Sequence, residues 1–342
     1  MILHEHLTDR QKDVLRSLVQ CFIDSAIPVA SSHLTKHFFV DLSPATIRNV
    51  MAVLEKRGYI DHPHTSAGRI PTDLGYREYV DNLMQPNELS RGMKKTIEER
   101  LGSATEADEV LQMTSRMLSK ISHQLSIVSA PQTSLGRLEK LELVQLSTTR
   151  VLVVLTMFSG IVKTIAMEVA DDIPREKLDN IARRLNERLA GYSLKEIRDT
   201  VGQRVGDLRD EETGIIRLII VSSKKLFDET RDYGRLHVSG TKNIVEQPEF
   251  KDPHYARSVI EILENEELIV HLLEQVPVGG VWVTIGSENG NKQLEQYSLV
   301  VSTYRIGDVP GMIGLIGPKR MNYARAVPLV EYAARSISNA LR

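Results

Sequence analysis

The chain has 342 residues, which at roughly 150 residues per domain predicts two or three domains. Hydrophobic residues make up 42% of it, which excludes a mainly disordered chain, and the single cysteine, Cys21, excludes an internal disulfide or a thiolate-rich zinc site. The formal net charge is −2, so no protein-wide positive field attracts nucleic acid, and any DNA binding must be local.

The first sixty residues predict three short helices. Segment 8–25 begins with a T-x-x-Q capping box and carries apolar residues on one face at helical spacing. Ser31 or Ser32 can cap a second helix. Ser43 followed by Pro44 is a strong start for a third helix. The buried face of this third helix is predicted to consist of Ile47, Val50, Met51 and Leu54.

A two-stranded hairpin is predicted directly after the third helix. Two short extended pieces, 59–60 and 69–71, enclose a stretch rich in turn-forming residues. Three compact helices followed by such a wing are typical of a winged helix-turn-helix, in which the third helix enters the major groove of DNA. The sequence therefore predicts a DNA-binding domain at the N-terminus.

The exposed face of the third helix would then read the DNA. Asn49 can pair bidentately with adenine, Arg48 can bind guanine or a phosphate, and Ala45 can contact a thymine methyl group. Donors at the hairpin tip can contact phosphates or the minor groove. The candidate DNA-binding residues are Ser43, Ala45, Thr46, Arg48, Asn49, Lys56, His64, Thr65, Ser66 and Arg69.

Charge supports this interpretation only weakly. Residues 1–80 contain nine basic and nine acidic residues, so we expect modest non-specific affinity and a dependence on dimer avidity. The plain alternative is an ordinary solvated helix face, because any surface helix carries such residues.

The rest of the chain predicts an α+β multidomain protein. A helix over 72–83 ends at a boundary near residue 85, and helical periodicity then continues to about residue 130. Strands are expected within 141–167 and 281–316, in one antiparallel sheet interrupted by a mostly helical insertion. The predicted domains are 1–85 for DNA binding, 86–135 as a helical linker region, 136–192 with 276–342 as a discontinuous sheet domain, and 193–275 as the insertion.

Two further expectations rest on this arrangement. Residues 151–167 would have to pair with 281–316 across the insertion, which makes folding slow. The insertion carries more apolar residues at 215–220 than it needs to bury on itself, which favours a dimer contact there. A hairpin is also predicted within 236–244.

Four segments resemble the HrcA family, the heat-inducible transcription repressors of bacteria. They are SPATIRNVMAVLE at 43–55, PHTSAGRIPTDLGYREYVD at 63–81, QPEF at 247–250 and GPKRMNY at 317–323. The resemblance covers nearly the whole chain. It implies that the sheet domain is GAF-like, that the insertion is a dimerisation domain, and that a dimer represses chaperone operons at the inverted-repeat element CIRCE with support from the GroE chaperonin. This chain departs from the family pattern Pro-Val-Gly-Ser-Lys/Arg, because residues 28–33 read PVASSH, so His33 would have to take over a contact of the second helix to the DNA backbone.

Other functions are weighed against this one. His33 and His37 lie one helical turn apart, but without nearby cysteines they make a poor metal site, so no metal or cofactor is expected. Glycines 311, 314 and 317 lack the context of a nucleotide cradle, and no nucleophile elbow or H-E-x-x-H motif occurs, so an enzyme is not expected. The alternative function is a winged-helix regulator controlled by a small ligand in the GAF-like domain.

The cellular location follows from two features of the sequence. The longest apolar run, 151–158, is far shorter than the roughly 20 residues that span a bilayer, and the first residues lack the basic flank and apolar stretch of a signal peptide. We therefore expect a cytoplasmic protein that is associated with the nucleoid when it is bound to DNA.

Overall fold

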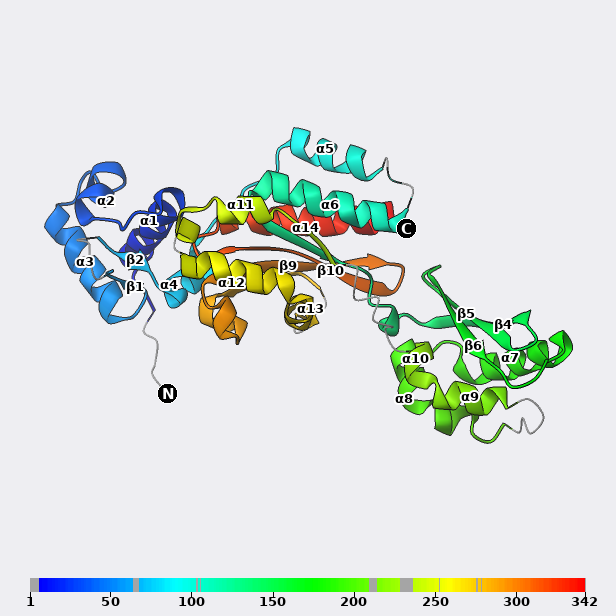
Figure 1. Ribbon diagram of the computed structural model, residues 1–342. Coiled ribbons are helices and arrows are strands. Elements are labelled where there is room, and N and C mark those ends of the chain that lie inside the picture. The colour runs from blue at the N-terminus through cyan, green and yellow to red at the C-terminus, as the bar shows by residue number, and fades with distance from the viewer. Residues whose placement is uncertain are drawn as a thin grey trace. The chain divides into compact units, whose positions relative to one another are not determined.

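The computed structural model forms two compact units (Figure 1). It describes residues 6–63, 68–102, 104, 106–208, 214–227, 236–251, 253–274, 276, 277 and 279–341. The first unit comprises residues 1–128, 237–302 and 313–336. The second unit comprises residues 129–236, 303–312 and 337–342. Among the described residues, no helix is both long and apolar enough to cross a membrane.

The first unit begins with the three predicted helices and the predicted hairpin. They are α1 (Asp9–Ser25), α2 (Ser31–His37), α3 (Pro44–Lys56), β1 (Ile60–Asp61) and β2 (Ile70–Pro71). The Thr8 capping box is present at the start of α1, as predicted. The Ser43 hydroxyl accepts a hydrogen bond from the Thr46 amide at the start of α3, with Pro44 in the first turn. Both helix starts are therefore confirmed. Capping depends only on residues within one turn, so the sequence alone can predict it.

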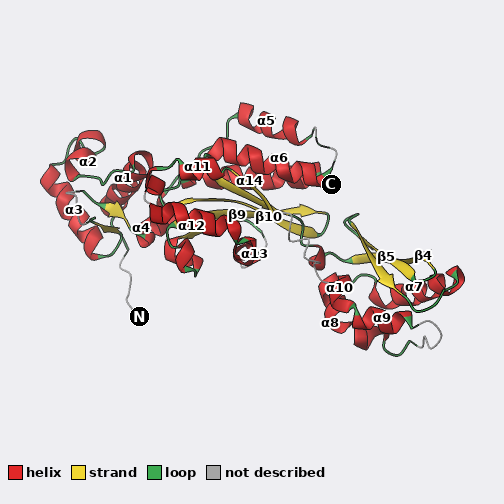
Figure 2. Cartoon of the chain, in the orientation of Figure 1, coloured by secondary structure: helices red, strands yellow, loops and turns green. Residues whose placement is uncertain are grey.

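The helix after the hairpin leads into a sheet with helices on both sides. The predicted helix over 72–83 is α4 (Asp73–Glu78) followed by a π-helical turn, η1 (Tyr79–Leu83). The five-stranded sheet has the order β7-β3-β10-β9-β8. Its strands are β3 (Leu125–Ser129), β7 (Leu236–Ser239), β8 (Val281–Ile285), β9 (Tyr297–Ile306) and β10 (Val309–Pro318). Helices cover both faces of this sheet, and they are α6 (Ala107–Ser122), α11 (Thr241–Val245), α12 (Pro253–Glu264), α13 (Glu266–Glu274) and α14 (Tyr323–Ala340) (Figures 1 and 2). Helix α5 (Arg91–Leu101) packs on α6.

The second unit is a three-stranded sheet packed on helices. The strands are β4 (Leu138–Ser147), β5 (Arg150–Met157) and β6 (Val162–Glu168), joined by successive antiparallel hairpins. The helices are α7 (Arg175–Leu189), α8 (Leu194–Val205), α9 (Ile215–Val221) and α10 (Ser223–Phe227). One face of the sheet and one face of each helix share a single apolar core. The Asn186 amide group ties α7 to both backbone groups of Leu141 in β4 at 2.7 Å.

The structure corrects the predicted strand pairing. Residues 151–167 do not pair with 281–316, because β4, β5 and β6 satisfy one another in a sheet of their own. The sheet domain instead takes its extra strand from β3, which the sequence placed in the helical linker region. Residues 136–192 therefore share a core with the helices that follow them, and Val309 is the one residue of 276–342 in that core among the described residues.

Two smaller predictions are also wrong. The segment 236–244 is not a hairpin, since β7 is followed directly by α11. The prediction that the insertion cannot bury its apolar residues at 215–220 is the second. Ile215, Ile216 and Ile219 are buried in the core of the second unit, and Leu218 and Ile220 pack against it.

Candidate nucleic-acid interface

Helix α3 has one buried and one exposed face. Ile47, Met51 and Leu54 are buried as predicted, and Val50 is half-buried. The candidate reading residues on this helix lie on the other face. Ser43, Ala45, Arg48, Asn49 and Lys56 are exposed, and Thr46 is half-buried.

The exposed face combines small residues with hydrogen-bonding side chains. Ala45 and Ala52 leave room for close approach to a groove, and Arg48 and Asn49 project between them. Arginine and asparagine are the side chains that pair bidentately with guanine and adenine. The Thr46 hydroxyl lies 2.9 Å from the Ser43 hydroxyl, so these two hydroxyl groups hold the first turn and leave the reading to its neighbours.

The hairpin is tied to α3 and to the segment before α2. Arg69 Nε donates to Glu55 Oε2 at 3.0 Å, and the ring Nδ1 of His62 lies 3.1 Å from Glu55 Oε1. The backbone of Arg69 also pairs with that of Val29 through two hydrogen bonds of 2.8 and 2.9 Å. Arg69 therefore supports the hairpin in addition to its predicted contact with DNA. The other candidate residues of the hairpin, His64, Thr65 and Ser66, lie outside the described residues.

The same cluster is the one place, within the described part of the chain, where three potential metal ligands gather. The ligand atoms of Glu55, Asp61 and His62 lie within 4.8 Å of one another. Both Glu55 oxygens are already engaged by Arg69 and His62, so the carboxylate acts as a hydrogen-bond acceptor that fixes the hairpin. His33 and His37, whose rings lie 4.5 Å apart, are both exposed on α2.

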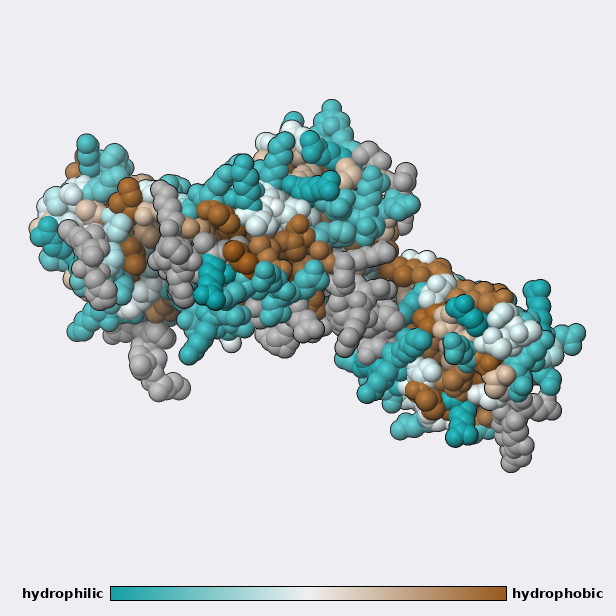
Figure 3. Space-filling view, viewed as in Figure 1, coloured by the Kyte–Doolittle hydropathy of each residue, from teal (hydrophilic) through white to brown (hydrophobic). Residues whose placement is uncertain are grey.

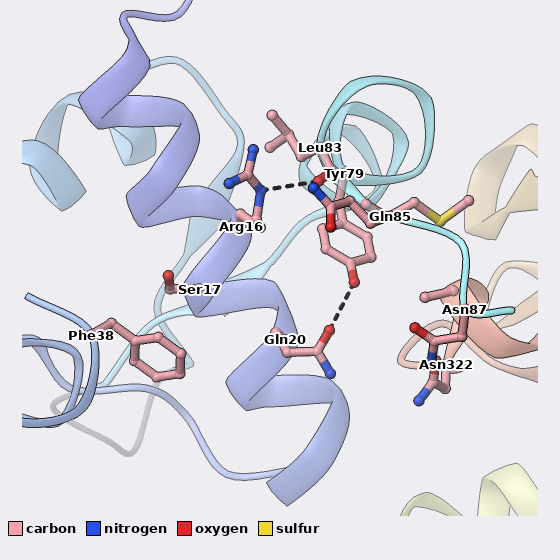
Figure 4. Close-up of a pocket in the computed structure, with 11 residues that line it drawn as sticks. Arg16, Ser17, Gln20, Phe38, Tyr79, Leu83, Gln85, Asn87 and Asn322 are labelled. Atoms are coloured by element: carbon pink, nitrogen blue, oxygen red, sulfur yellow. Dashed lines mark hydrogen bonds between the residues drawn. The ribbon is translucent and has the colours of Figure 1, made fainter.

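A pocket of about 440 Å³ lies between α1, η1 and the start of α14 (Figure 4). Tyr79 donates from its hydroxyl to Gln20 at 2.8 Å, and Arg16 Nε donates to the Leu83 carbonyl at 3.0 Å. The predicted place for a ligand was the interior of the sheet domain. That interior is filled by fully buried side chains, of which the largest are Tyr297, Tyr304 and Tyr323. Burial raises the pKa of the Tyr304 and Tyr323 hydroxyls, as expected for groups without water around them.

Comparison with known proteins defines the class of this chain. The family described as "HrcA protein C terminal domain" matches residues 108–327. The heat-inducible transcription repressor HrcA of Chlorobium chlorochromatii (strain CaD3) is 42% identical over 99% of this chain and 98% of its own. The repressor of the same name from Chlorobaculum parvum (strain DSM 263 / NCIMB 8327) is 41% identical over 99% of both chains. These relatives are transcription repressors.

A solved structure supports the same fold over the full length. The crystal structure of a hypothetical protein matches with a TM-score of 0.58 and 25% identity, over 98% of this chain and 99% of the other. Taken with the sequence matches, this shows that the chain belongs to the HrcA family of heat-inducible transcription repressors. The family resemblance that the sequence motifs carried is confirmed.

The first prediction concerns Asn49 as a reader of bases. Asn49→Ala should weaken binding to the cognate operator by about 1 to 3 kcal/mol, because a bidentate pair with a base is lost. It should also narrow the difference between cognate and altered sites in competition binding with single-base variants. Lys56→Ala, at the end of the same face, is the control and should weaken all sequences alike. Uniform loss for Asn49→Ala would show that α3 docks differently.

The second prediction separates the two roles of Arg69. Arg69→Ala should weaken binding to all DNA sequences similarly, because it removes a phosphate donor and the support of the hairpin at once. Glu55→Ala removes only the support, so it should retain more affinity than Arg69→Ala in the same titration. If Glu55→Ala costs as much as Arg69→Ala, the arginine acts through the hairpin alone.

Proposed function

We propose that this repressor binds an inverted-repeat operator, CIRCE, as a dimer, with residues 1–85 as a winged-helix domain and α3 in the major groove. The observation that carries the proposal is the exposed face of α3, where Arg48 and Asn49 stand beside small residues. A two-fold dimer matches two half-sites that lie whole helical turns apart, about 34 Å each. The hairpin after α3 serves as the wing, and its tip contacts the DNA backbone.

Dimerisation follows from the electrostatics of the DNA-binding region. Residues 1–80 are formally neutral, so one domain has little long-range attraction to DNA. Two linked domains gain an effective concentration that multiplies the affinity of each half-site. A DNA-binding domain without net charge therefore gains most from an operator with two half-sites. Binding both half-sites at once requires a surface on which two copies of the chain form a dimer.

The structure offers such a surface on the outer face of the sheet β4-β5-β6. Val151, Val153 and Leu155 of β5 point into the core, so the alternate residues face outward. Val144, Leu152 and Ala166 lie opposite one another in register across the three strands. Together with neighbours on the same face they form the outer apolar face, which consists of Val144, Leu152, Val154, Val162 and Ala166. Figure 3 shows hydrophobic side chains gathered over the strands of this unit.

The dimer contact is thus proposed within the second unit but on its strands. It was predicted in 193–275, where the apolar residues at 215–220 turned out to be core. Val144 is 46% exposed and Val162 is 54% exposed, which is unusual for valines in the two outer strands of a well-packed sheet. A second copy related by a two-fold axis would cover this face with the same residues.

The third prediction tests this face. A variant with Val144→Asp and Val162→Asp should sediment as a monomer, because two carboxylates cannot be buried in an apolar contact. Its affinity for the full repeat should fall to that for a half-site in mobility shifts. Val221→Asp is the control, since Val221 is 77% exposed on α9 of the same unit. A variant that remains a dimer would place the contact elsewhere.

We further propose that the family's heat response acts through folding, with the GroE chaperonin as partner. Slow folding was predicted from a pairing of 151–167 with 281–316, and the structure does not contain this pairing. A different long-range pairing takes its place, because Val128 of β3 pairs with Ile313 of β10 and most of the second unit lies between them in the chain. Contacts of such sequence separation slow folding and leave strands exposed meanwhile.

The fourth prediction concerns the active fraction of the protein. At heat-shock temperature the purified protein should lose operator binding by aggregation, and chaperonin with ATP should raise the active fraction without changing the intrinsic operator affinity. Titration with excess operator, with and without chaperonin and alongside light scattering, measures both quantities. If the active fraction is complete without chaperonin and heat releases DNA reversibly without scattering, the protein senses heat directly.

A further inference from the structure

Helix α4 presents three side chains of one helical turn to the sheet domain. Asp73, Tyr76 and Arg77 are spaced i, i+3 and i+4, so they lie on one face. Their partners lie in two segments of the sheet domain, 283–288 and 319–323, and both segments are more than 200 residues away in the chain. These contacts join α4 to distant parts of the chain, so they determine how the N-terminal helices are attached to the rest of the unit.

Asp73 accepts hydrogen bonds from two segments. Lys319 Nζ, just after β10, donates at 2.8 Å, and the Ser287 amide and hydroxyl donate at 2.9 and 3.0 Å. Burial by itself raises the pKa of Asp73, but the bonds from Lys319 and Ser287 outweigh it and hold the pKa below its ordinary value. Asp73 is therefore a charged acceptor whose partners come entirely from the sheet domain.

The approach of Asp73 depends on Gly286, in the short 3-10 turn η5 (Gly286–Asn289). Gly286 has a φ of +57°, and a methyl group built on it would overlap the Asp73 carboxylate. Gly290, just past the end of η5, has a similar φ of +64°, but a methyl group there would meet nothing within 4 Å. An alanine would therefore be strained to a similar degree at both positions, but only at Gly286 would it also clash with Asp73.

Arg77 makes the second attachment. Its guanidinium donates to both oxygens of Glu288, with Nε at 2.9 Å from Oε1, and to the Val283 carbonyl at 2.6 Å. A bidentate arginine–carboxylate pair fixes direction as well as distance. Hydrogen bonds from Arg77 to Glu288 raise the pKa of Arg77, as expected for a charge-assisted pair. A third bond, to Asp81 at 3.1 Å, stays within the same helical segment.

Tyr76 fills the space between these two attachments. Its ring is buried and lies 6.1 Å from the ring of Tyr323, centroid to centroid. Beside it, Arg320 pairs with Glu249 and also donates to the Ile23 carbonyl at the end of α1. Together, the contacts of Asp73, Tyr76, Arg77 and Arg320 form the joint between the N-terminal helices and the sheet domain.

We propose that Asp73 and Arg77 are positioning residues for operator binding, which hold α3 in one direction on the sheet domain so that two half-sites can be read at once. This rests on the proposed binding of an inverted repeat by a dimer. Three of the segments that build the joint lie within motifs that resemble the family, at 63–81, 247–250 and 317–323, whereas the segment 283–288 lies outside them. None of the joint's side chains is on the exposed face of α3, so these motif residues do not serve direct reading.

The physical reason is the effective concentration of the second half-site. A rigid attachment keeps the second α3 near its half-site after the first has bound, whereas a loose one spreads it over many orientations. Binding of one isolated half-site involves no second domain, so it does not depend on the joint. Loosening the joint should therefore lower the affinity for the full repeat and relax the required spacing, with half-site affinity unchanged.

The experiment compares Gly286→Ala with Gly290→Ala in the full-length protein. We expect Gly286→Ala to lower affinity for the full repeat by about tenfold or more and to bind repeats with an altered spacer almost as well as the natural one. Its affinity for a half-site duplex and its dimeric state in sedimentation should match the wild type. Gly290→Ala, which carries the strain without the clash, should keep full-repeat affinity.

A second pair of variants covers the case in which Gly286→Ala does not fold. Arg77→Met removes the bonds to Glu288 and Val283, and Asp81→Asn removes only the bond within the helix, so the first should lose full-repeat affinity and the second should not. Equal losses on the half-site and the full repeat, or no loss at all, would overturn the positioning role. A wild type without preference for the full repeat would instead reject the proposed function itself.

Discussion

The central strand β10 is the element on which the first unit depends. All ten of its residues are buried, and it lies between β3 and β9. Because unpaired backbone groups in such a position cost free energy, β10 is stable only when both neighbours pair with it. Its end at Pro318 then places Lys319 and Arg320 against α4 and Glu249. Pairing within the sheet therefore decides where the N-terminal helices are attached.

The exposed face of α3 carries positive charge although residues 1–80 are formally neutral. Several charges of this region are used inward or sideways: Asp73 binds Lys319, Arg77 binds Glu288, and Glu55 binds Arg69. Partly buried pairs of this kind contribute direction more than net stability. Arg48 and Lys56 are exposed on α3, and its acidic residue Glu55 is paired with Arg69, so the exposed face of α3 is positive although the sum over the region is zero.

The sequence correctly predicted α1, α3, the hairpin and the strands within 141–167 and 281–316, but it missed β3 and predicted the wrong strand pairing. Capping residues and apolar periodicity determine a helix through neighbours a few positions away, so its start can be read directly. The segment Leu125–Ser129 has only three apolar residues, and it follows a long helix, so periodicity alone cannot distinguish this strand from a buried helical turn. The apolar residues at 215–220 were counted as surplus, although α8 and α10 of the same insertion contact α9 and these helices share one core with β4, β5 and β6.

By itself the sequence determined the helices of the DNA-binding region, the face of α3 that bears Arg48 and Asn49, and membership of the HrcA family. Only the tertiary structure decided which strand accompanies β10, that strands 138–168 form a sheet of their own, and that Asp73 and Arg77 reach Ser287 and Glu288. The physical reason is the distance along the chain between the residues that interact. Caps and helical faces depend on hydrogen bonds and packing within one or two turns, whereas strand partners and ion pairs across 200 residues depend on the path of the whole chain.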